Sequence, residues 1–133
     1  MSIMQMISEH PDVAGHDNEA LSLAVRHMMY CAAICNSCAD ACGAEDDSAE
    51  RMDCIRRCMD CADVCTTGYR IGSRRTGDNE AVLKAFLEVC AQACEACAEH
   101  CEMHDDAHCR RCATMCRECA EDCRKAAASI TPS

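Results

Sequence analysis

Cysteine recurs at a fixed spacing in four segments of this chain, which indicates that the chemistry of this protein depends on thiols. The segments are CAAICNSCADAC at 31–42, CIRRCMDCADVC at 54–65, CAQACEACAEHC at 90–101 and CATMCRECAEDC at 112–123. Each places its cysteines at steps of four, three and four residues, and Cys109 brings the total to seventeen. Thiols in this number can bind soft metal ions, form disulfides or fill a core.

The cysteine spacing predicts a helix in each segment. At about 100° per residue, the four cysteines lie at about 0°, 40°, −20° and 20°, on one narrow stripe roughly 16 Å long. A strand would distribute them over both faces. The residues between them are mainly Ala, Arg, Asp, Glu and Asn, which suit the polar side of a helix. We therefore expect four amphipathic helices that bury thiols where leucine or isoleucine would normally lie.

Glycines and capping residues separate the four segments. The residues expected to end or begin helices are Gly43, Asp47 or Ser48, Gly72, Gly77, Asp78, and Asp105 or Asp106. Because the connections are short, consecutive helices should be antiparallel neighbours. The sequence predicts an all-α fold, an antiparallel up-down-up-down four-helix bundle with a cysteine-lined core, as a single domain over 1–133. We expect 1–16 to be an N-terminal extension with a short helical turn before Pro11, and 129–133 to be a frayed tail.

The two ends of this bundle differ in chemistry. In one direction the stripes continue into an apolar plug formed by Leu21, Ala24, Tyr69, Leu83, Phe86, Leu87, Ala127 and Ile130. In the other direction the residues on or near the stripes are Met52, His100, Met103, His104, His108 and Cys109. Thiol, thioether and imidazole groups bind soft and borderline metal ions. The sequence therefore predicts a metal entrance, the mouth, at this end.

The composition leaves little hydrocarbon to drive folding. Leu, Ile, Val and Phe number sixteen in 133 residues, aromatic residues make up 2%, and the formal net charge is −10. Such a composition is typical of disorder unless another interaction supplies free energy. Metal–thiolate bonding can supply it.

Composition also argues against several partners. An acidic chain lacks the basic face that binds nucleic acid, and no stretch approaches the roughly 20 apolar residues of a membrane span. The N-terminal segment has no Lys or Arg before an apolar run and shows no export signal. The odd cysteine count rules out complete pairing within one chain. We expect a cytoplasmic protein with reduced thiols, no nucleic acid partner and no membrane.

Four roles for the thiols can be compared. Disulfide staples would place cysteines in cross-helix pairs rather than fill whole faces, and cysteine alone would pack a core more weakly than leucine. Iron–sulfur proteins usually carry a compact C-x2-C-x2-C run that wraps a loop around one cluster, and this sequence has none. Storage of metal ions along a thiolate-lined core fits the repeat best.

Charge and geometry favour Cu(I) among the metals. Zinc takes four thiolates and leaves a formal charge of about −2, which is costly to bury several times. Cu(I) is soft and accepts two or three thiolates. With bonds of about 2.3 Å, a linear S–Cu–S bridge spans roughly 4.6 Å, close to the separation of about 5–6 Å between neighbours on a helix. One Cu(I) per thiolate is neutral, so many ions can share one core.

The fourfold CxxxCxxCxxxC pattern over 31–123 resembles the bacterial copper storage proteins, and the missing export signal resembles their cytosolic branch. The resemblance implies a homotetramer of bundles, several Cu(I) ions per chain bound by core cysteines, and His or Met ligands at one open end. The ligands that it implies are Cys31, Cys35, Cys38, Cys42, Cys54, Cys58, Cys61, Cys65, Cys90, Cys94, Cys97, Cys101, Cys112, Cys116, Cys119 and Cys123, with Cys109, His104 and His108 at the mouth. Whether Met52, Met103 or His100 binds copper stays open, because helix phase places neither methionine squarely on a cysteine stripe.

The sequence therefore predicts a cytosolic store or buffer for Cu(I). Two alternatives use the same thiols, a metallothionein-like zinc or cadmium detoxification protein and a thiol redox protein. A redox protein needs one activated cysteine at a helix start, whereas pairs such as Cys35 and Cys38 lie in mid-helix and recur in every segment. No catalytic triad, phosphate loop or carboxylate pair stands out, so we expect no enzyme. The sequence identifies no protein that donates or accepts the copper.

Overall fold

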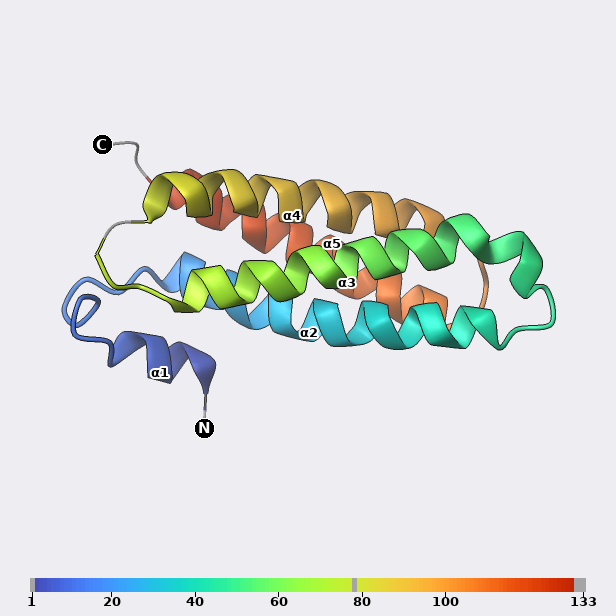
Figure 1. Cartoon of the computed structure of the whole chain (residues 1–133), viewed down its shortest axis with the longest axis horizontal. Coiled ribbons are helices and arrows are strands. Elements are labelled where there is room, and N and C mark those ends of the chain that lie inside the picture. Colours follow the sequence, from blue (N-terminus) through green and yellow to red (C-terminus); the bar gives the residue numbers. More distant parts are fainter. Residues whose placement is uncertain (1, 78, 131–133) are drawn as a thin grey trace.

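Four long α-helices form a bundle in this protein. A computed structural model describes residues 2–77 and 79–130. Its elements are α1 (Ile3–Ser8), α2 (Glu19–Gly43), the 3-10 helix η1 (Ser48–Arg51), α3 (Met52–Ser73), α4 (Glu80–Cys101) and α5 (Ala107–Ser129). Figure 1 shows the long helices along one axis, each running opposite to the one before it. Both α2 and α4 pack against α3 and α5. The predicted all-α four-helix fold is confirmed.

A side-chain hydrogen bond caps the start of α2, whereas the start of α5 has no such bond. Asn18 Oδ1 accepts a hydrogen bond of 3.1 Å from the Leu21 N–H, which satisfies a donor that the first turn leaves unpaired. Asp106 occupies the predicted cap position of α5 but makes no capping bond there. Its carboxylate pairs with Arg51 at the end of η1 instead. The cap residue therefore links two elements at one end of the bundle. The predicted break at Asp78 lies outside the described residues.

Small residues let the helices approach closely. Alanine directly follows a cysteine at seven buried positions, namely Ala32, Ala39, Ala62, Ala91, Ala98, Ala113 and Ala120. A methyl group beside each of these thiols adds little width to the contact between neighbouring helices. The short cysteine side chains can then reach one another across the bundle axis.

The N-terminal extension and the C-terminus both pack onto the bundle. The predicted turn before Pro11 is α1, which contacts α2 and buries Ile7. The tail is ordered farther than predicted, because Ser129 ends α5 and Ile130 is buried. Asn18 Nδ2 donates to Ser129 Oγ over 2.9 Å, and Lys84 Nζ donates to the Ile130 carbonyl over 3.1 Å. These bonds hold 129 and 130 in place, whereas 131–133 lie outside the described residues.

An apolar plug closes the end of the bundle where α2 and α4 begin. The predicted plug residues that are buried are Leu21, Ala24, Leu83, Leu87, Ala127 and Ile130. Tyr69 and Phe86, which were also predicted in the plug, are half-buried and pack against the edge of the core. Gly68 and Gly72 are the buried residues of α3 at this level. Because α2 packs tightly here, a Cβ atom on Gly72 would lie 2.7 Å from Val25 Cγ2.

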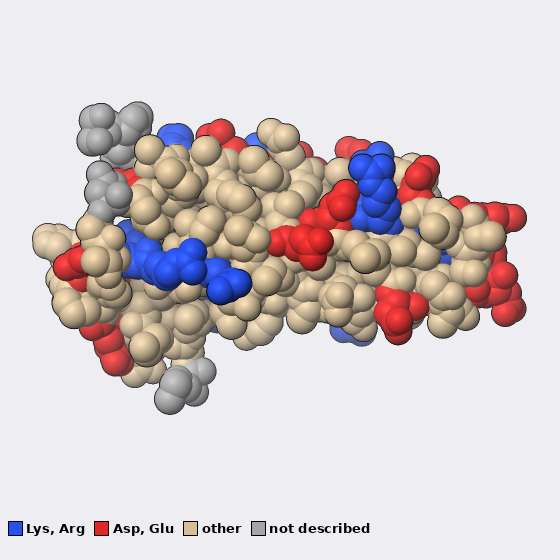
Figure 2. Space-filling view, in the orientation of Figure 1, with Lys and Arg blue, Asp and Glu red and all other residues tan. Residues whose placement is uncertain are grey.

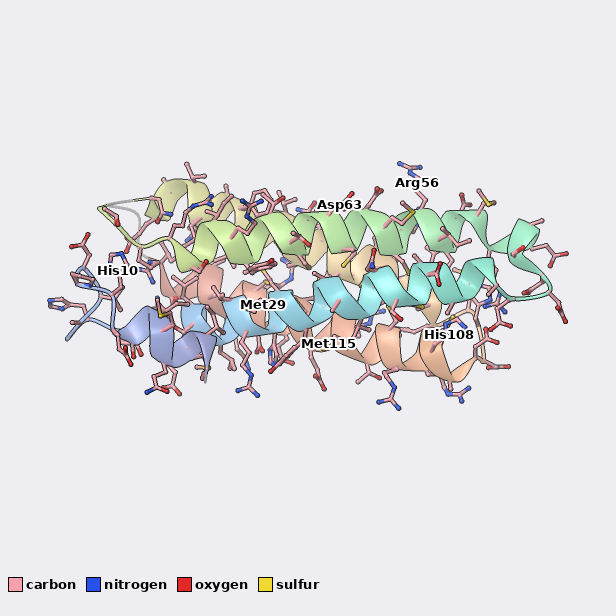
Figure 3. The ribbon with its side chains drawn as sticks, turned by 60° about the horizontal axis from the view of Figure 1, so that its bottom comes forward. His10, Met29, Arg56, Asp63, His108 and Met115 are labelled. Carbon is pink, nitrogen blue, oxygen red and sulfur yellow. The ribbon has the colours of Figure 1, made fainter. Side chains whose placement is uncertain are left out.

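The outer faces of the helices are polar. Figure 3 shows Arg56 and Asp63 directed outward from α3, and the Arg56 side chain is 79% exposed. In the parts of the chain that the structure describes, no helix combines the length and apolar character needed to cross a membrane.

Gly72→Ala should destabilise the metal-free, reduced protein by about 1–3 kcal/mol, the usual cost of overpacking. Val25 is β-branched and has one strongly preferred rotamer in a helix, so it cannot turn aside and the helices must separate. Urea unfolding measures the change. The control is Gly43→Ala, where an added Cβ meets no atom within 4 Å. This control should leave stability unchanged or raise it by up to about 1 kcal/mol, and equal stabilities of the two variants would contradict the prediction.

Candidate metal centre

All seventeen predicted cysteine ligands are buried and free of disulfides. The inward stripes of α2, α3, α4 and α5 supply sixteen, as the spacing predicts, and Cys109 on the first turn of α5 supplies the seventeenth. The disulfide-stapled interpretation is therefore not supported. The thiols instead form a continuous line of sulfur along the bundle axis.

Sulfur atoms from different helices lie in van der Waals contact. Representative Sγ–Sγ distances are 3.4 Å for Cys35–Cys116, 3.5 Å for Cys58–Cys97 and 3.6 Å for Cys61–Cys94. A disulfide would need about 2.05 Å. Three sulfurs bound at about 2.3 Å to one ion in a plane would lie about 4 Å apart, and four in a tetrahedron about 3.8 Å. The metal-free spacing therefore already suits a shared metal ion.

The thiols group into overlapping sets whose ligand atoms all lie within 4.8 Å of one another. Five such sets are Cys31–Cys61–Cys65–Cys94, Cys31–Cys35–Cys61–Cys116, Cys35–Cys97–Cys112–Cys116, Cys38–Cys58–Cys101–Cys112 and Cys38–Cys42–His108–Cys109. Each set in this order shares at least one cysteine with the next. Metal ions in neighbouring sets would therefore be bridged by common thiolates. The arrangement suits a chain of linked ions rather than separate sites.

Burial keeps the outermost thiols protonated in the metal-free protein. It raises the pKa of Cys42 to about 11, and it also raises the pKa of Cys109, because a charged thiolate loses its hydration inside the bundle. A metal ion must therefore displace protons when it binds there.

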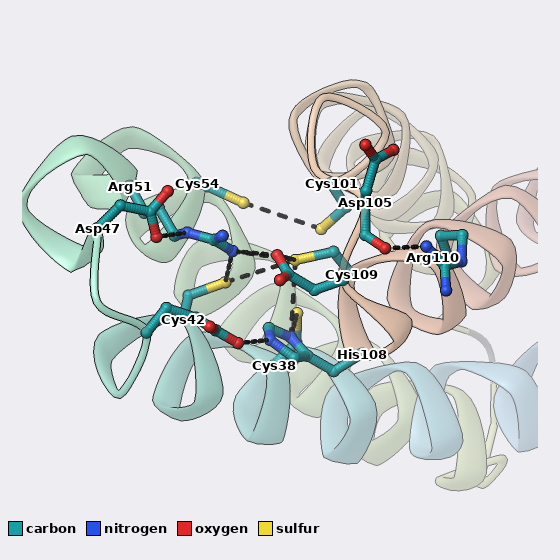
Figure 4. Close-up of polar contacts among 12 residues, drawn as sticks. Cys38, Cys42, Asp47, Arg51, Cys54, Cys101, Asp105, His108, Cys109 and Arg110 are labelled. Atoms are coloured by element: carbon teal, nitrogen blue, oxygen red, sulfur yellow. Dashed lines mark hydrogen bonds and ion pairs between the residues drawn. The ribbon is translucent and has the colours of Figure 1, made fainter.

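His108 belongs to the set at the mouth, as predicted. Its Nδ1 lies 3.4 Å from Cys38 Sγ and 3.6 Å from Cys109 Sγ, and its Nε2 lies 2.9 Å from Glu45 Oε1. Figure 4 shows the imidazole between these thiols and the carboxylate. The hydrogen bond with Cys38 and then that with Glu45 raise the pKa of His108. If Nε2 donates to Glu45, Nδ1 directs its lone pair at the thiols, the arrangement in which carboxylates orient metal-binding histidines.

The other predicted mouth residues are partly or largely exposed to solvent. His104 is half-buried just after α4, and the five sets above do not include it. His100 is also half-buried, whereas Met52 is 63% and Met103 is 70% exposed. His104 as a ligand therefore stays a prediction.

Arg51 is a mouth residue that the sequence analysis missed. Its side chain is 7% exposed, and its Nη1 lies 3.9 Å from Cys42 Sγ and 3.7 Å from Cys109 Sγ. Nε donates to Asp47 over 2.7 Å and Nη1 donates to Asp106. The guanidinium lowers the pKa of both carboxyls. Spacing of four residues could have indicated the bond to Asp47, but nothing local indicated the contacts with α5.

Arg51 therefore covers the outermost pair of thiols (Figure 4). The mouth end also carries many acidic side chains, which Figure 2 shows at the right-hand end of the bundle. They belong mainly to the connection before α3, whose residues include Glu45, Asp46, Asp47 and Glu50. Negative charge around an opening raises the local concentration of cations.

Comparison with known proteins identifies similar chains. A family model described as copper storage protein matches residues 17–128. The structure of the copper storage protein Ccsp from Streptomyces lividans, loaded with 10 copper equivalents, is 39% identical over 97% of this chain and 100% of that chain, with a TM-score of 0.91. The metal-free copper storage protein 3 from Bacillus subtilis is 32% identical over 79% and 96%, with a TM-score of 0.70. No curated protein matches this chain.

Arg51→Ala should make Cys42 and Cys109 react faster with a thiol reagent while the deeper thiols keep their rates. The reason is that the guanidinium shields these two sulfurs from solvent. Stopped-flow counting of fast-reacting thiols in the metal-free protein measures the effect. Arg124→Ala is the control, because Arg124 pairs with Glu95 on the surface. A slower reaction of the Arg51 variant would contradict the prediction, because it would mean that the positive charge of Arg51 activates these two thiols more than its side chain shields them.

Replacing His104 and His108 by alanine should slow Cu(I) uptake or weaken a few sites, while most of the capacity remains. The single variant His108→Ala should cause the larger part of this loss of uptake rate or affinity, since only His108 is placed against thiols in the sets above. Anaerobic stopped-flow uptake and titration against a chelator measure rate and capacity. A large fall in capacity would instead make the histidines core ligands.

Proposed function

Because the chain belongs to the copper storage protein family, we propose that it is a cytosolic, high-capacity store for Cu(I) whose ions are bound by the core cysteine thiolates. One observation carries the proposal most directly. The thiol sets overlap from the plug to the mouth, each sharing a cysteine with the next. Such sharing allows many ions to occupy one core.

The charge balance of a shared core favours Cu(I) over zinc. Sγ–Sγ spacing alone suits both metals, because planar and tetrahedral sites need similar separations. However, each zinc bound to four thiolates leaves a buried negative charge, whereas one Cu(I) per bridging thiolate leaves none. A metallothionein-like zinc or cadmium protein therefore remains the weaker alternative. Dispersal of the thiols over all four helices likewise disfavours a redox protein with a single reactive pair, and we propose no catalytic role.

Copper is proposed to enter and leave at the mouth. His108 and the outer thiols Cys38, Cys42 and Cys109 would take an ion from its carrier by ligand exchange and pass it inward through shared cysteines. In each step the incoming thiol gives up its proton as its sulfur bonds the ion, and the thiolate that leaves the ion takes up a proton. The plug at the other end leaves the mouth as the natural route.

Location and assembly follow as parts of the same proposal. A related Streptomyces lividans structure is described as a cytosolic copper storage protein, with 41% identity over 89% of this chain and 100% of that chain. The chain is proposed to act in the cytosol, as one domain, in a homotetramer. Exposed apolar side chains on the outer faces, such as Met59 at 52% and Val82 at 63%, support an assembly. Light scattering of the reduced protein tests the homotetramer, and a monomer would overturn it.

The storage function predicts a high capacity for Cu(I). Anaerobic titration of the reduced protein against a calibrated chelator should give roughly ten or more tightly bound ions per chain, because bridging allows about one ion per thiolate. Excess zinc should not change the number. A saturation value of one or two ions, or displacement by zinc, would refute a copper store.

Copper loading should strongly stabilise the fold. A site that binds only the folded state adds about 2.7 kcal/mol when free ligand is 100 times Kd, which corresponds to roughly 10 °C for one site in a domain of this size. The loaded protein should therefore melt at least this much higher than the metal-free protein, as followed by circular dichroism under anaerobic conditions. Equal melting temperatures would mean that the thiol core is stable without metal.

A further inference from the structure

Met28 continues the cysteine stripe of α2 toward the plug. The stripe positions on this helix are 42, 38, 35 and 31, at steps of four, three and four, and the next step of three reaches Met28. Its side chain is fully buried, with an exposed fraction of 0%. Met28 therefore places a thioether where the pattern would place one more thiol.

The thioether sulfur of Met28 lies beside the thiol of Cys90. A Cβ atom built on Gly68 would lie 2.6 Å from Met28 Sδ and 2.9 Å from Cys90 Sγ. The two sulfur atoms are therefore no farther apart than the sum of these distances. Two metal–sulfur bonds of about 2.3 Å span roughly 4.6 Å, so a shift of at most about 1 Å would bring both sulfur atoms onto a single ion.

The innermost cysteines of the other three helices meet at this level. Cys65 of α3, Cys90 of α4 and Cys123 of α5 are the last cysteines of their stripes toward the plug, and all three are fully buried, whereas α2 contributes Met28. Cys65 is in turn 3.7 Å from Cys94, and both are members of the innermost thiol set given above. A site here would directly extend the series of overlapping sets.

Gly68 makes room for this arrangement. It follows Cys65 by three residues, so it stands at the next stripe position of α3. Any larger residue would occupy the space beside Met28 Sδ and Cys90 Sγ. Methionine commonly fills gaps in cores, but here its sulfur is placed against a thiol at the end of a metal-binding series.

We propose that Met28 is a thioether ligand for Cu(I) and completes, with Cys65, Cys90 and Cys123, the innermost site of the store. The proposal rests on the Cu(I)-storage function. A thioether is neutral and carries no proton to displace, and with thiolate it belongs to the soft ligands that select Cu(I). Because its sulfur is neutral, Met28 would end the line of thiolates without adding a negative charge of its own next to the plug.

Selenomethionine labelling tests the proposal directly. The full-length protein is labelled, loaded anaerobically with Cu(I), and measured by extended X-ray absorption at the selenium edge, with copper per chain counted in the same sample. We expect a selenium–copper scattering contribution in the loaded protein that is lost in Met28→Leu, a substitution of similar volume. It should remain in the control Met29→Leu, whose residue is adjacent on α2 but only half-buried.

The outcomes separate the ligand from the storage function. A fully loaded wild-type protein without selenium–copper scattering would overturn the role of Met28 and leave storage standing, whatever the folding of the variants. Scattering that persists unchanged in Met28→Leu would overturn it as well, by assigning the contact to another methionine. A copper content of only one or two ions per chain would overturn both proposals.

Discussion

Contact between unpaired thiols at the bundle axis is the constraint on which the rest of this structure depends. Sulfur atoms from four helices lie 3.4–4.0 Å apart in many pairs, such as Cys35–Cys116 and Cys54–Cys101. Short side chains can meet across a bundle only if the helices are close, and the buried alanines that follow seven of the cysteines allow this. A core built in this way buries little hydrocarbon. The same feature that limits stability without metal therefore creates a container for metal ions.

The two ends of the container are closed by different physical means. Leucine and alanine side chains exclude water at the plug, and glycines on α3 let α2 pack against them. At the mouth an ion-pair network covers the core instead. Arg51 joins η1 to the start of α5 through Asp106 and covers two thiols. Buried apolar packing opens only against the hydrophobic effect, whereas a side chain held by ion pairs near solvent can move aside. This difference supports the proposal that copper enters and leaves at the mouth.

Much of the fold and of the thiol site could be predicted from sequence, because both depend on helical periodicity. Cysteines at steps of four, three and four can share one face only in a helix, and all seventeen are indeed buried. Predictions that needed contacts between helices were less successful. Tyr69 lies at the edge of the core. The positions of α3 that face the core at this level are Gly68 and Gly72, because α2 approaches α3 too closely there for a large side chain. Arg51 was missed because its partners Asp106 and Cys109 lie more than fifty residues away.

The sequence by itself determined the element type, the inward direction of the thiols and the soft-metal chemistry, since these follow from residue identity and spacing along one helix. Only the tertiary structure decided which thiols form a set, which histidine meets them, and that Met28 Sδ lies against Cys90. The physical reason is that the axial shift and rotation of one helix against another are set by side-chain packing over the whole interface. A shift of one residue would change every sulfur–sulfur pair while leaving the sequence pattern intact.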